Sequence, residues 1–449
     1  MVAVGLAASD RVLAETAPPH AIAMHGAPAL PAGFSNFAYA DPSAPKGGLL
    51  VQGLLGTFDS LNPLIVKGLA LQQTRGYVTE SLMARGYDEP FTLYGLLAES
   101  VETDDERSYV SFTLHAAARF SDGTPVTAED VTFSWQLLRD KGRPNHRTYY
   151  AKVARAQAFG PRTVRFDFAD AADRELPLIL GLMPVLPKHA IDPETFEQTT
   201  FAPPLGSGPY VVADVRPGER VTFRRDPNYW GRDLAVNRGF WNFDEVRFDF
   251  YRDANTYLEA FKRGLYDVRA ESDPGRWETG YGGPALRDGR IVKEAFASGL
   301  PHGMSGLVFN TRRDLFADIR VREAVGLLFD FAWVNRTFFF DRFRRTASYF
   351  EGSELSAYGR PADAAERALL KRFPGAVRAD ILEGTWRVPG SDGSGRDRDR
   401  LRAALDLFAH AGWEIDGGEL RERASGRAFA FELLAATKEQ ERLALAVQR

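Results

Sequence analysis

The sequence contains no cysteine and only seven histidines among its 449 residues. Without cysteine the protein can form no disulfide, no thiolate metal site and no thiol nucleophile. The lipid-modified cysteine that tethers many secreted receptors to a membrane is absent as well. The histidines show neither an i,i+4 pair nor a neighbouring carboxylate pattern, so a structural zinc is not expected. We therefore expect no metal, no cofactor and a freely diffusing protein.

Long apolar runs and an excess of one charge are also missing. No stretch approaches the ~20 apolar residues that span a bilayer, so insertion into a membrane is not expected. The formal net charge is −4, and the two signs are interspersed along the chain. This distribution predicts no nucleic-acid partner.

The length and the beginning of the chain give further limits. With 449 residues the chain exceeds one ordinary domain, so two or three lobes with sizeable cores are expected. Residues 1–14 read MVAVGLAASDRVLA, a short apolar run with a small-residue ending but no basic residue ahead of it. This pattern fits a weak export signal or a disordered tail, and the residues alone leave both open.

Residues 96–138 carry the most informative pattern. Apolar residues alternate over 109–115 and predict a half-buried strand. An Asp-Gly turn follows, and Thr127 with Asp130 three residues later predicts a capping box. The next helix has its inward stripe at Val131, Trp135 and Leu138. No nucleophile with a base, metal cage or phosphate loop occurs in this stretch.

A crossover unit is predicted over residues 243–270. Alternating apolar residues at 246–250 predict a strand, and residues 254–261 form a helix face that Gly264 ends as a C-cap. A second strand is predicted at residues 266–270. Strand, helix and strand at this spacing form a parallel or mixed sheet, with a ligand site near the carboxyl ends of its strands.

The last third of the chain has weaker patterns. Residues 296–306 are rich in glycine and small residues, which suit a hinge crossing between lobes, and an ordinary surface loop fits them equally. Residues 391–400 predict a solvated polar loop. Strands are predicted at 307–310 and 429–434, and helices at 318–330, 401–412 and 439–449. Because no strand follows the final helix, we expect a fragment with exposed apolar surface.

These blocks resemble, in order, the family 5 extracellular solute-binding proteins, which are the peptide, dipeptide and nickel receptors of ABC importers. The resemblance rests on residues 96–138 and on LGSGPYVVADVRPGERVTFRRDPNYW at residues 205–230. The sequence HAIAMHGAPALPAGFSNFAYADPSAPKGG near the start and SYFEGSEL at Ser348 look most like the Yej-type oligopeptide receptors. The likeness covers roughly residue 21 to the end.

The resemblance implies an α/β fold of the type II periplasmic binding protein class. Two hinged lobes with mixed sheets would carry an extra inserted domain. The implied domains are a signal-like or disordered tail (1–25), the first part of lobe I (26–69), an inserted domain II (70–200), the second part of lobe I (201–298) and an incomplete lobe III (299–449).

The resemblance also implies binding without catalysis. The protein would be the periplasmic substrate-binding component of an ABC importer, a monomer that captures oligopeptides in a cleft between lobes and delivers them to permease subunits. Microcin C-like or cell-wall peptides are the implied cargoes, and a nickel chelate, haem, opine or oligosaccharide is the alternative. Two other classes are alternatives: a hydrolase, for which the sequence shows no nucleophile turn, and a periplasmic sensor or chaperone built on the same receptor fold.

Candidate ligand contacts are implied at the end of the first strand. Gly56, Thr57, Phe58 and Asp59 match the segment that lies along the ligand in related receptors. A plain turn before Asn62 is the alternative interpretation of these four residues.

Two further segments are candidates by resemblance. Gly303, Met304, Ser305 and Gly306 match a lobe-crossing segment where the backbone approaches the ligand, and a hinge alone is the alternative. Thr437 and Lys438 match, loosely, the place of a cation for the peptide carboxylate, and the start of a surface helix is the alternative. The family's acidic anchor for the peptide amino group lies in a segment beyond the last residue of this sequence.

Overall fold

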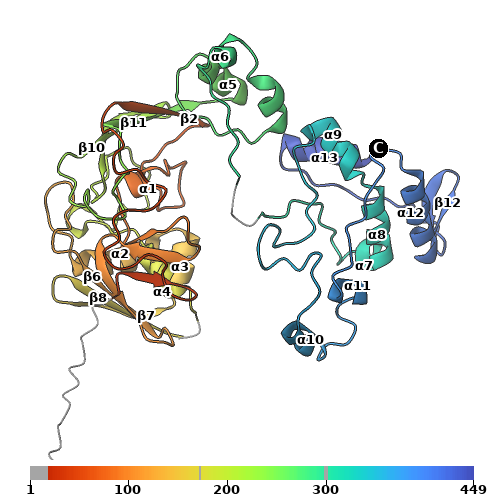
Figure 1. Ribbon diagram of the computed structural model, residues 1–449, viewed down its shortest axis with the longest axis horizontal. Helices are drawn as coiled ribbons and strands as arrows, with labels where there is room; N and C mark the ends of the chain where they lie inside the picture. The colour runs from red at the N-terminus through yellow and green to blue at the C-terminus, as the bar shows by residue number, and fades with distance from the viewer. Residues whose placement is uncertain (1–18, 171–172, 298–301, 449) are drawn as a thin grey trace, which may run out of the picture. The chain divides into compact units, whose positions relative to one another are not determined.

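The computed structural model describes residues 19–170, 173–297 and 302–448. The described chain forms two compact units (Figure 1), a first unit Met1–Arg269 and a second unit Ala270–Arg449. The predicted boundaries within and between lobes stay predictions.

One four-stranded antiparallel sheet organises the main core of the first unit. Its strand order is β5-β6-β8-β7. The strands are β5 (Ala98–Glu102), β6 (Tyr109–Leu114), β7 (Val153–Phe159) and β8 (Thr163–Phe168). The predicted alternation in β6 is confirmed, because its apolar side chains at Val110, Phe112 and Leu114 are fully buried on one face.

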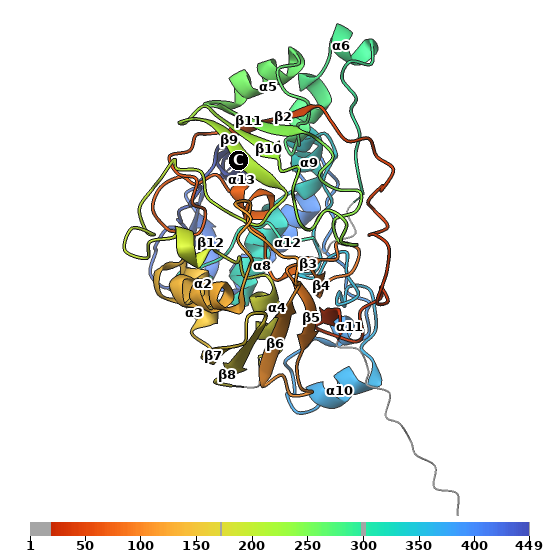
Figure 2. The same ribbon diagram turned by 90° about the vertical axis from the view of Figure 1, so that its left-hand side faces the viewer.

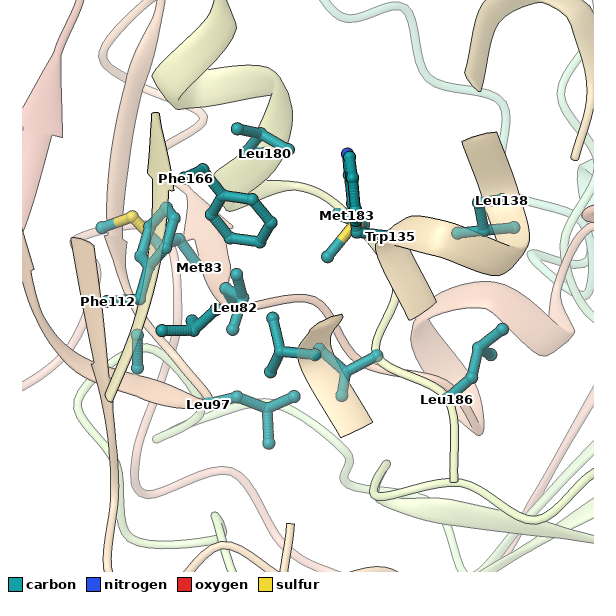
Figure 3. Close-up of a cluster of buried hydrophobic side chains, with 14 of the residues drawn as sticks. Leu82, Met83, Leu97, Phe112, Trp135, Leu138, Phe166, Leu180, Met183 and Leu186 are labelled. Atoms are coloured by element: carbon teal, nitrogen blue, oxygen red, sulfur yellow. The ribbon is translucent and has the colours of Figure 1, made fainter. Parts of the chain in front are cut away.

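Helix α2 (Ala128–Lys141) packs on β7 and β8 of this sheet and lies against α3 (Pro144–Tyr150) (Figure 2). Side chains from the sheet, from α2 and from α4 (Leu176–Gly181) point into a common apolar cluster (Figure 3). The predicted capping box is confirmed at the start of α2. The Asp130 backbone N–H donates to Thr127 Oγ1 at 3.4 Å, and the Thr127 N–H donates to the Asp130 carboxylate at 2.9 Å.

A second four-stranded sheet is mixed, with strand order β2-β11-β10-β9. Strands β2 (Leu49–Leu55) and β11 (Glu245–Tyr251) are parallel, whereas β10 (Arg220–Arg225) pairs antiparallel with both β11 and β9 (Tyr210–Arg216).

The predicted crossover follows β11. Helix α5 (Ala254–Lys262) leads to Val268, which forms a parallel bridge with Gln52 of β2. The strand expected over residues 266–270 is thus reduced to one bridge. Gly264 has φ +72°, the left-handed conformation expected directly after the helix end.

Gly53 in β2 allows α5 to approach the sheet closely. A Cβ atom at this position would lie 2.6 Å from the Tyr257 ring and 2.9 Å from the Tyr266 ring. The Tyr257 hydroxyl donates to the Gly53 carbonyl at 3.1 Å. Two tyrosines therefore occupy the space that any larger residue at position 53 would need.

A small sheet of order β1-β4-β3 completes the first unit. Its strands are β1 (Ala21–Ala23), β3 (Met83–Arg85) and β4 (Thr92–Gly95), and α1 (Thr74–Tyr77) is a short helical segment before β3. The three residues of β1 are buried and paired with β4. The tail predicted over residues 1–25 therefore ends earlier than predicted, because residues 21–23 pair with β4. Residues 1–18 lie outside the described part.

The second unit is mainly helical. Its core lies where α8 (Ile319–Leu328) meets α12 (Arg398–His410) and the hairpin of β12 (Trp413–Asp416) and β13 (Glu419–Glu422). The other elements are a π-helical turn (Arg276–Gly280), α6 (Pro284–Arg287), α7 (Asp314–Ala317), α9 (Phe331–Phe339), α10 (Ala364–Leu370), α11 (Ala379–Leu382) and α13 (Lys438–Gln448).

Two predicted strands of the second unit are wrong. Residues 307–310 and 429–434 form no strand, and Ala428 makes a single bridge to Arg421. Val308 and Leu434 are 95% and 99% exposed. Alternation alone does not make a strand, because the backbone also needs a neighbouring strand that accepts its hydrogen bonds.

The polar loop predicted over residues 391–400 is too long. Helix α12 already begins at Arg398, because the Asp397 carboxylate accepts hydrogen bonds from the N–H groups of Asp399 and Arg400, both at 3.1 Å. Arg400 is buried within this helix.

Candidate functional site

The carboxyl end of β2 is held by its parallel neighbour. Gly56 follows the last residue of β2 with φ +109° and donates its N–H to the Tyr251 carbonyl at 2.8 Å. Thr57 is exposed and donates its hydroxyl to the Gly218 carbonyl at 3.2 Å. Carboxyl ends of parallel strands are the usual location of ligands in open sheets, and a ligand site at this end of β2 stays a prediction.

The next two predicted contacts have structural tasks in this unit. The Phe58 side chain is 2% exposed and its ring centroid lies 4.8 Å from that of Phe250. Asp59 accepts a hydrogen bond from the Leu69 N–H at 2.6 Å and so closes the loop between them. Of the four residues, Gly56 and Thr57 offer the accessible groups, and their contact with a ligand stays a prediction.

The other predicted residues lie in the second unit. Gly303, Met304, Ser305 and Gly306 are exposed and form no regular element, while residues 298–301 of the predicted hinge lie outside the described residues. These roles stay predictions, as does a meeting of these residues with residues 56–59.

Thr437 caps the last helix. Its hydroxyl accepts a hydrogen bond from the Gln440 N–H at 3.2 Å, and its carbonyl accepts one from the Glu441 N–H at 2.9 Å. Lys438 begins α13, and its side chain lies outside the described part. The helix start is therefore present, and the proposed cation stays a prediction.

A pocket of about 420 Å³ in the first unit escaped the sequence analysis. Its walls combine residues 37–39, the loop and strand around residues 75–87, and residues 236–241. Phe37 and Tyr39 stack with ring centroids 5.1 Å apart, and Phe240 meets Tyr39 edge to face at 6.0 Å. Aromatic rings from distant segments thus form one apolar wall.

Buried polar groups form the floor of this pocket. Glu80 is 4% exposed and accepts hydrogen bonds from the Tyr229 hydroxyl and, at 3.2 Å, from the Trp230 Nε1–H. Asn237 donates to the Tyr229 oxygen at 2.8 Å and accepts from the Trp241 Nε1–H at 3.0 Å. Desolvation raises the pKa of Glu80 to about 7, although these donors oppose the shift.

Tyr229 and Trp230 end the segment 205–230 that carries part of the family resemblance, and Tyr229 is buried. Local spacing could not show that they donate to Glu80, because Glu80 lies 149 and 150 residues earlier in the chain. An acidic residue close to the apolar residues Val78, Leu82 and Met83 was the one available signal.

Arg75, which lines the pocket, and Arg143 both act electrostatically on the buried His146. Arg75 donates to the Leu182 carbonyl at 2.9 Å, and Arg143 donates to the Ile65 carbonyl at 3.0 Å. His146 is 5% exposed and stacks on Tyr150 with parallel rings 5.5 Å apart. Desolvation and then the charges of Arg75 and Arg143 lower the pKa of His146 to about 4, so this histidine is neutral at physiological pH.

Two kinds of feature are missing from the described residues. No three of their histidine, aspartate and glutamate side chains gather in a way that could hold a metal ion. None of their helices has both the length and the apolar character to cross a membrane.

Comparison with solved structures defines the class of protein. The chain superposes on NikA of Brucella suis in complex with Fe(III)-EDTA with a TM-score of 0.64 and 19% identity, over 89% of this chain and 72% of that one. It superposes on AppA, the oligopeptide-binding protein of Bacillus subtilis, in complex with a nonapeptide, with a TM-score of 0.53 and 20% identity, over 90% and 72%. The fold is that of the type II periplasmic binding proteins, as predicted.

Sequence comparison gives the family. Residues 92–449 match the model of the bacterial extracellular solute-binding proteins, family 5. The chain belongs to this family, so it is a binding protein and not an enzyme, and the predicted membership is confirmed. We therefore describe it as a solute-binding protein of an ABC transporter.

Relatives with higher sequence identity place the chain more closely within family 5. A candidate binding protein of Brucella suis biovar 1 is 50% identical over 98% of this chain and 73% of its own length. The peptidoglycan-binding protein YepA of Agrobacterium fabrum is 47% identical over 96% and 72%. YejA of the same organism, whose name gives peptide binding, is 37% identical over 92% and 69%. The resemblance to Yej-type receptors is thereby confirmed.

Proposed function

We propose that the protein captures oligopeptides, including cell-wall peptides, in the periplasm and delivers them to the permease of an ABC importer. The single observation that carries this proposal is the 47% identity with a protein named for peptidoglycan binding, over 96% of the chain. The peptide binding named for YejA, at 37% identity, agrees with it.

The geometry of the mixed sheet supports an extended guest. Gly56 and Thr57 lie at the carboxyl end of β2, where Gly56 donates its N–H to the Tyr251 carbonyl and Thr57 is exposed. A peptide aligned there would exchange its water contacts for hydrogen bonds with fixed partners, since an unpaired buried amide costs about 1–3 kcal/mol. Main-chain pairing of this kind tolerates many guest sequences, because side chains then occupy roomier, hydrated space.

Calorimetric titration of the full-length protein tests the proposal. The panel should hold di-, tri- and tetrapeptides, a cell-wall stem peptide, a disaccharide of the cell wall without its peptide, and a nickel-histidine chelate. We expect saturable heat with at least one peptide and none with the disaccharide or the chelate. Binding of the sugar or the chelate in place of peptides would overturn the peptide cargo and leave the family assignment intact.

A further inference from the structure

Two guanidinium groups line the 420 Å³ pocket of the first unit. Arg75 and Arg85 both belong to its lining, on either side of the buried residues 78–80. Desolvation lowers the pKa of Arg75, and the charge of the neighbouring Arg85 lowers it further. Two cations of like charge thus face one cavity, which raises the electrostatic potential inside it.

Neither arginine has a carboxylate partner among the residues that the structure describes. Arg75 donates to the Leu182 carbonyl, which carries no net charge, and no described residue forms a hydrogen bond or an ion pair with the Arg85 side chain. Other arginines of the first unit do pair with a carboxylate, as Arg220 pairs with Asp249 at 2.7 Å. The pocket therefore holds positive charge that is left to solvent or to a ligand.

Glu80, the one carboxylate on the lining that the structure describes, does not neutralise these cations. Both of its oxygens are engaged, one by Tyr229 and the other by Trp230. Desolvation raises the pKa of Glu80, its hydrogen bonds with Tyr229, Ser207 and Trp230 oppose that rise, and no arginine contributes to the shift. The Glu80 carboxylate is therefore satisfied by hydrogen bonds with neighbouring side chains and not by an arginine.

Part of the lining is aromatic. Phe37, Tyr39, Tyr87 and Phe240 line the pocket, and Tyr87 is 74% exposed at its rim. Tyr39 holds this arrangement together, because its ring meets Tyr87 edge to face at 5.9 Å and its hydroxyl accepts the Tyr87 N–H at 3.1 Å. An apolar group lying on this wall would bury area favourably.

We propose that this pocket binds a carboxylate of the guest peptide between Arg75 and Arg85, with the apolar stem of that carboxylate against the aromatic wall. The inference rests on the proposed peptide cargo and adds to it a preference for an anionic guest. The carboxylate belongs either to the peptide's carboxyl terminus or to an acidic side chain. Guanidinium groups suit both sources, because their planar donors match carboxylate geometry.

Matched peptide pairs test this inference by calorimetry on the full chain. The tripeptide Ala-Ala-Phe and its carboxamide probe the terminal carboxylate. The carboxamides of Ala-Glu-Ala and Ala-Gln-Ala probe the side chain. We expect the acidic member of one pair to bind about tenfold more tightly than its neutral partner, the scale of one charge-assisted hydrogen bond. Added salt should reduce that preference.

Arginine variants locate the effect. Arg85→Gln should abolish most of the preference for the acid while leaving the binding of the neutral peptide within about twofold, because only the anionic group contacts it. Arg75→Gln is the second variant and should act in the same direction. Arg155→Gln is the control, since Arg155 is exposed on β7 and lines no part of this pocket. Thermal unfolding of each variant checks that it folds.

The outcomes separate the two proposals. Equal affinity for acid and neutral members, or equal losses in Arg85→Gln and Arg155→Gln, would overturn the carboxylate site and leave peptide capture standing. Failure of every peptide to bind while another solute binds would overturn both. A preference for the acid that only Arg75→Gln and Arg85→Gln remove supports the site.

Discussion

The two units of this chain differ in how their apolar residues are used. In the first unit, two four-stranded sheets and their helices surround large apolar clusters. Among the described residues of the second unit, a smaller cluster between α8, α12 and the β12–β13 hairpin is buried, while Phe296, Val308 and Leu434 are at least 82% exposed. Val308 and Leu434 belong to segments whose apolar pattern predicted strands, so an alternating pattern forms a strand only where a neighbouring strand pairs with it. The first unit should therefore resist opening more than the second.

Deleting a core ring gives the largest expected effect and tests this difference directly. Phe112 is fully buried in the main core of the first unit, and Phe112→Ala should cost about 3–5 kcal/mol, mostly visible as lost protection of first-unit amides. Phe408 is 3% exposed, and Phe408→Ala is the matching core variant in the second unit. Hydrogen exchange with mass spectrometry measures both. Phe340→Ala is the control, since that ring is 46% exposed. If either core variant opened both units equally, the two units would not be separate.

The pH dependence of stability sharpens the description of the first unit. Burial raises the pKa of Glu80 to about 7, so folding favours its protonated form, and that contribution is lost as pH rises from about 4.5 through 7. The pKa of His146 is lowered to about 4, chiefly by desolvation, so its contribution is lost as pH falls from about 6.5 through 4. Between pH 4.5 and 6.5 the two effects oppose each other.

Single variants should separate these effects. The double variant Glu80→Gln/His146→Gln keeps neither titrating group and is the reference. Relative to it, Glu80→Gln keeps His146 and should gain roughly 3 kcal/mol of unfolding free energy as pH rises from about 4 to 6.5. His146→Gln keeps Glu80 and should lose a similar amount as pH rises from 4.5 to about 7. Urea denaturation at several pH values measures this. Parallel curves for all variants would contradict the assigned burial of both groups.

Alanine substitutions at two glycines compare a closely packed position with an open one. Gly53→Ala should destabilise the first unit by about 1–3 kcal/mol, because its Cβ would meet the rings of Tyr257 and Tyr266. Gly303→Ala in the second unit should change stability by less than about 0.5 kcal/mol, because nothing lies within 4 Å of the new atom. Chemical denaturation followed by tyrosine and tryptophan fluorescence measures both. Equal effects would show that the approach of α5 to β2 is looser than described.

Substitutions at helix caps should give the smallest differences in stability. Thr127→Ala should cost about 1 kcal/mol, because Thr127 takes part in both halves of the α2 capping box. Thr437→Ala should cost less than half as much, since Thr437 is exposed and caps a terminal helix. Gln136, exposed in the middle of α2, is a suitable control site for substitution by alanine. A larger cost at Thr437 would contradict the comparison.

The sequence predicted those parts of the fold that short-range rules decide. Val110, Phe112 and Leu114 alternate because one face of β6 is buried, and Thr127 with Asp130 marks a helix start that depends on neighbouring residues alone. Residues 429–434 show the limit, because the absence of a pairing strand cannot be read from their own pattern.

The candidate site was less predictable for the same reason. Glu80 and Tyr229 are 149 residues apart, and Phe37 reaches the pocket from another segment of the chain. Phe58 and Asp59 were predicted as contacts by resemblance, whereas their side chains hold the β2 loop in place. Spacing along the chain carries little information on such meetings, since they depend on the completed fold.

Mass spectrometry of the solute that co-purifies with the full-length protein tests the central claim most directly. The protein is isolated natively from a bacterium that makes it, denatured, and its released solute is analysed. We predict an intact peptide, recovered with the same mass after prolonged incubation with the protein. A sugar, a metal chelate or a cleaved peptide in its place would contradict the account.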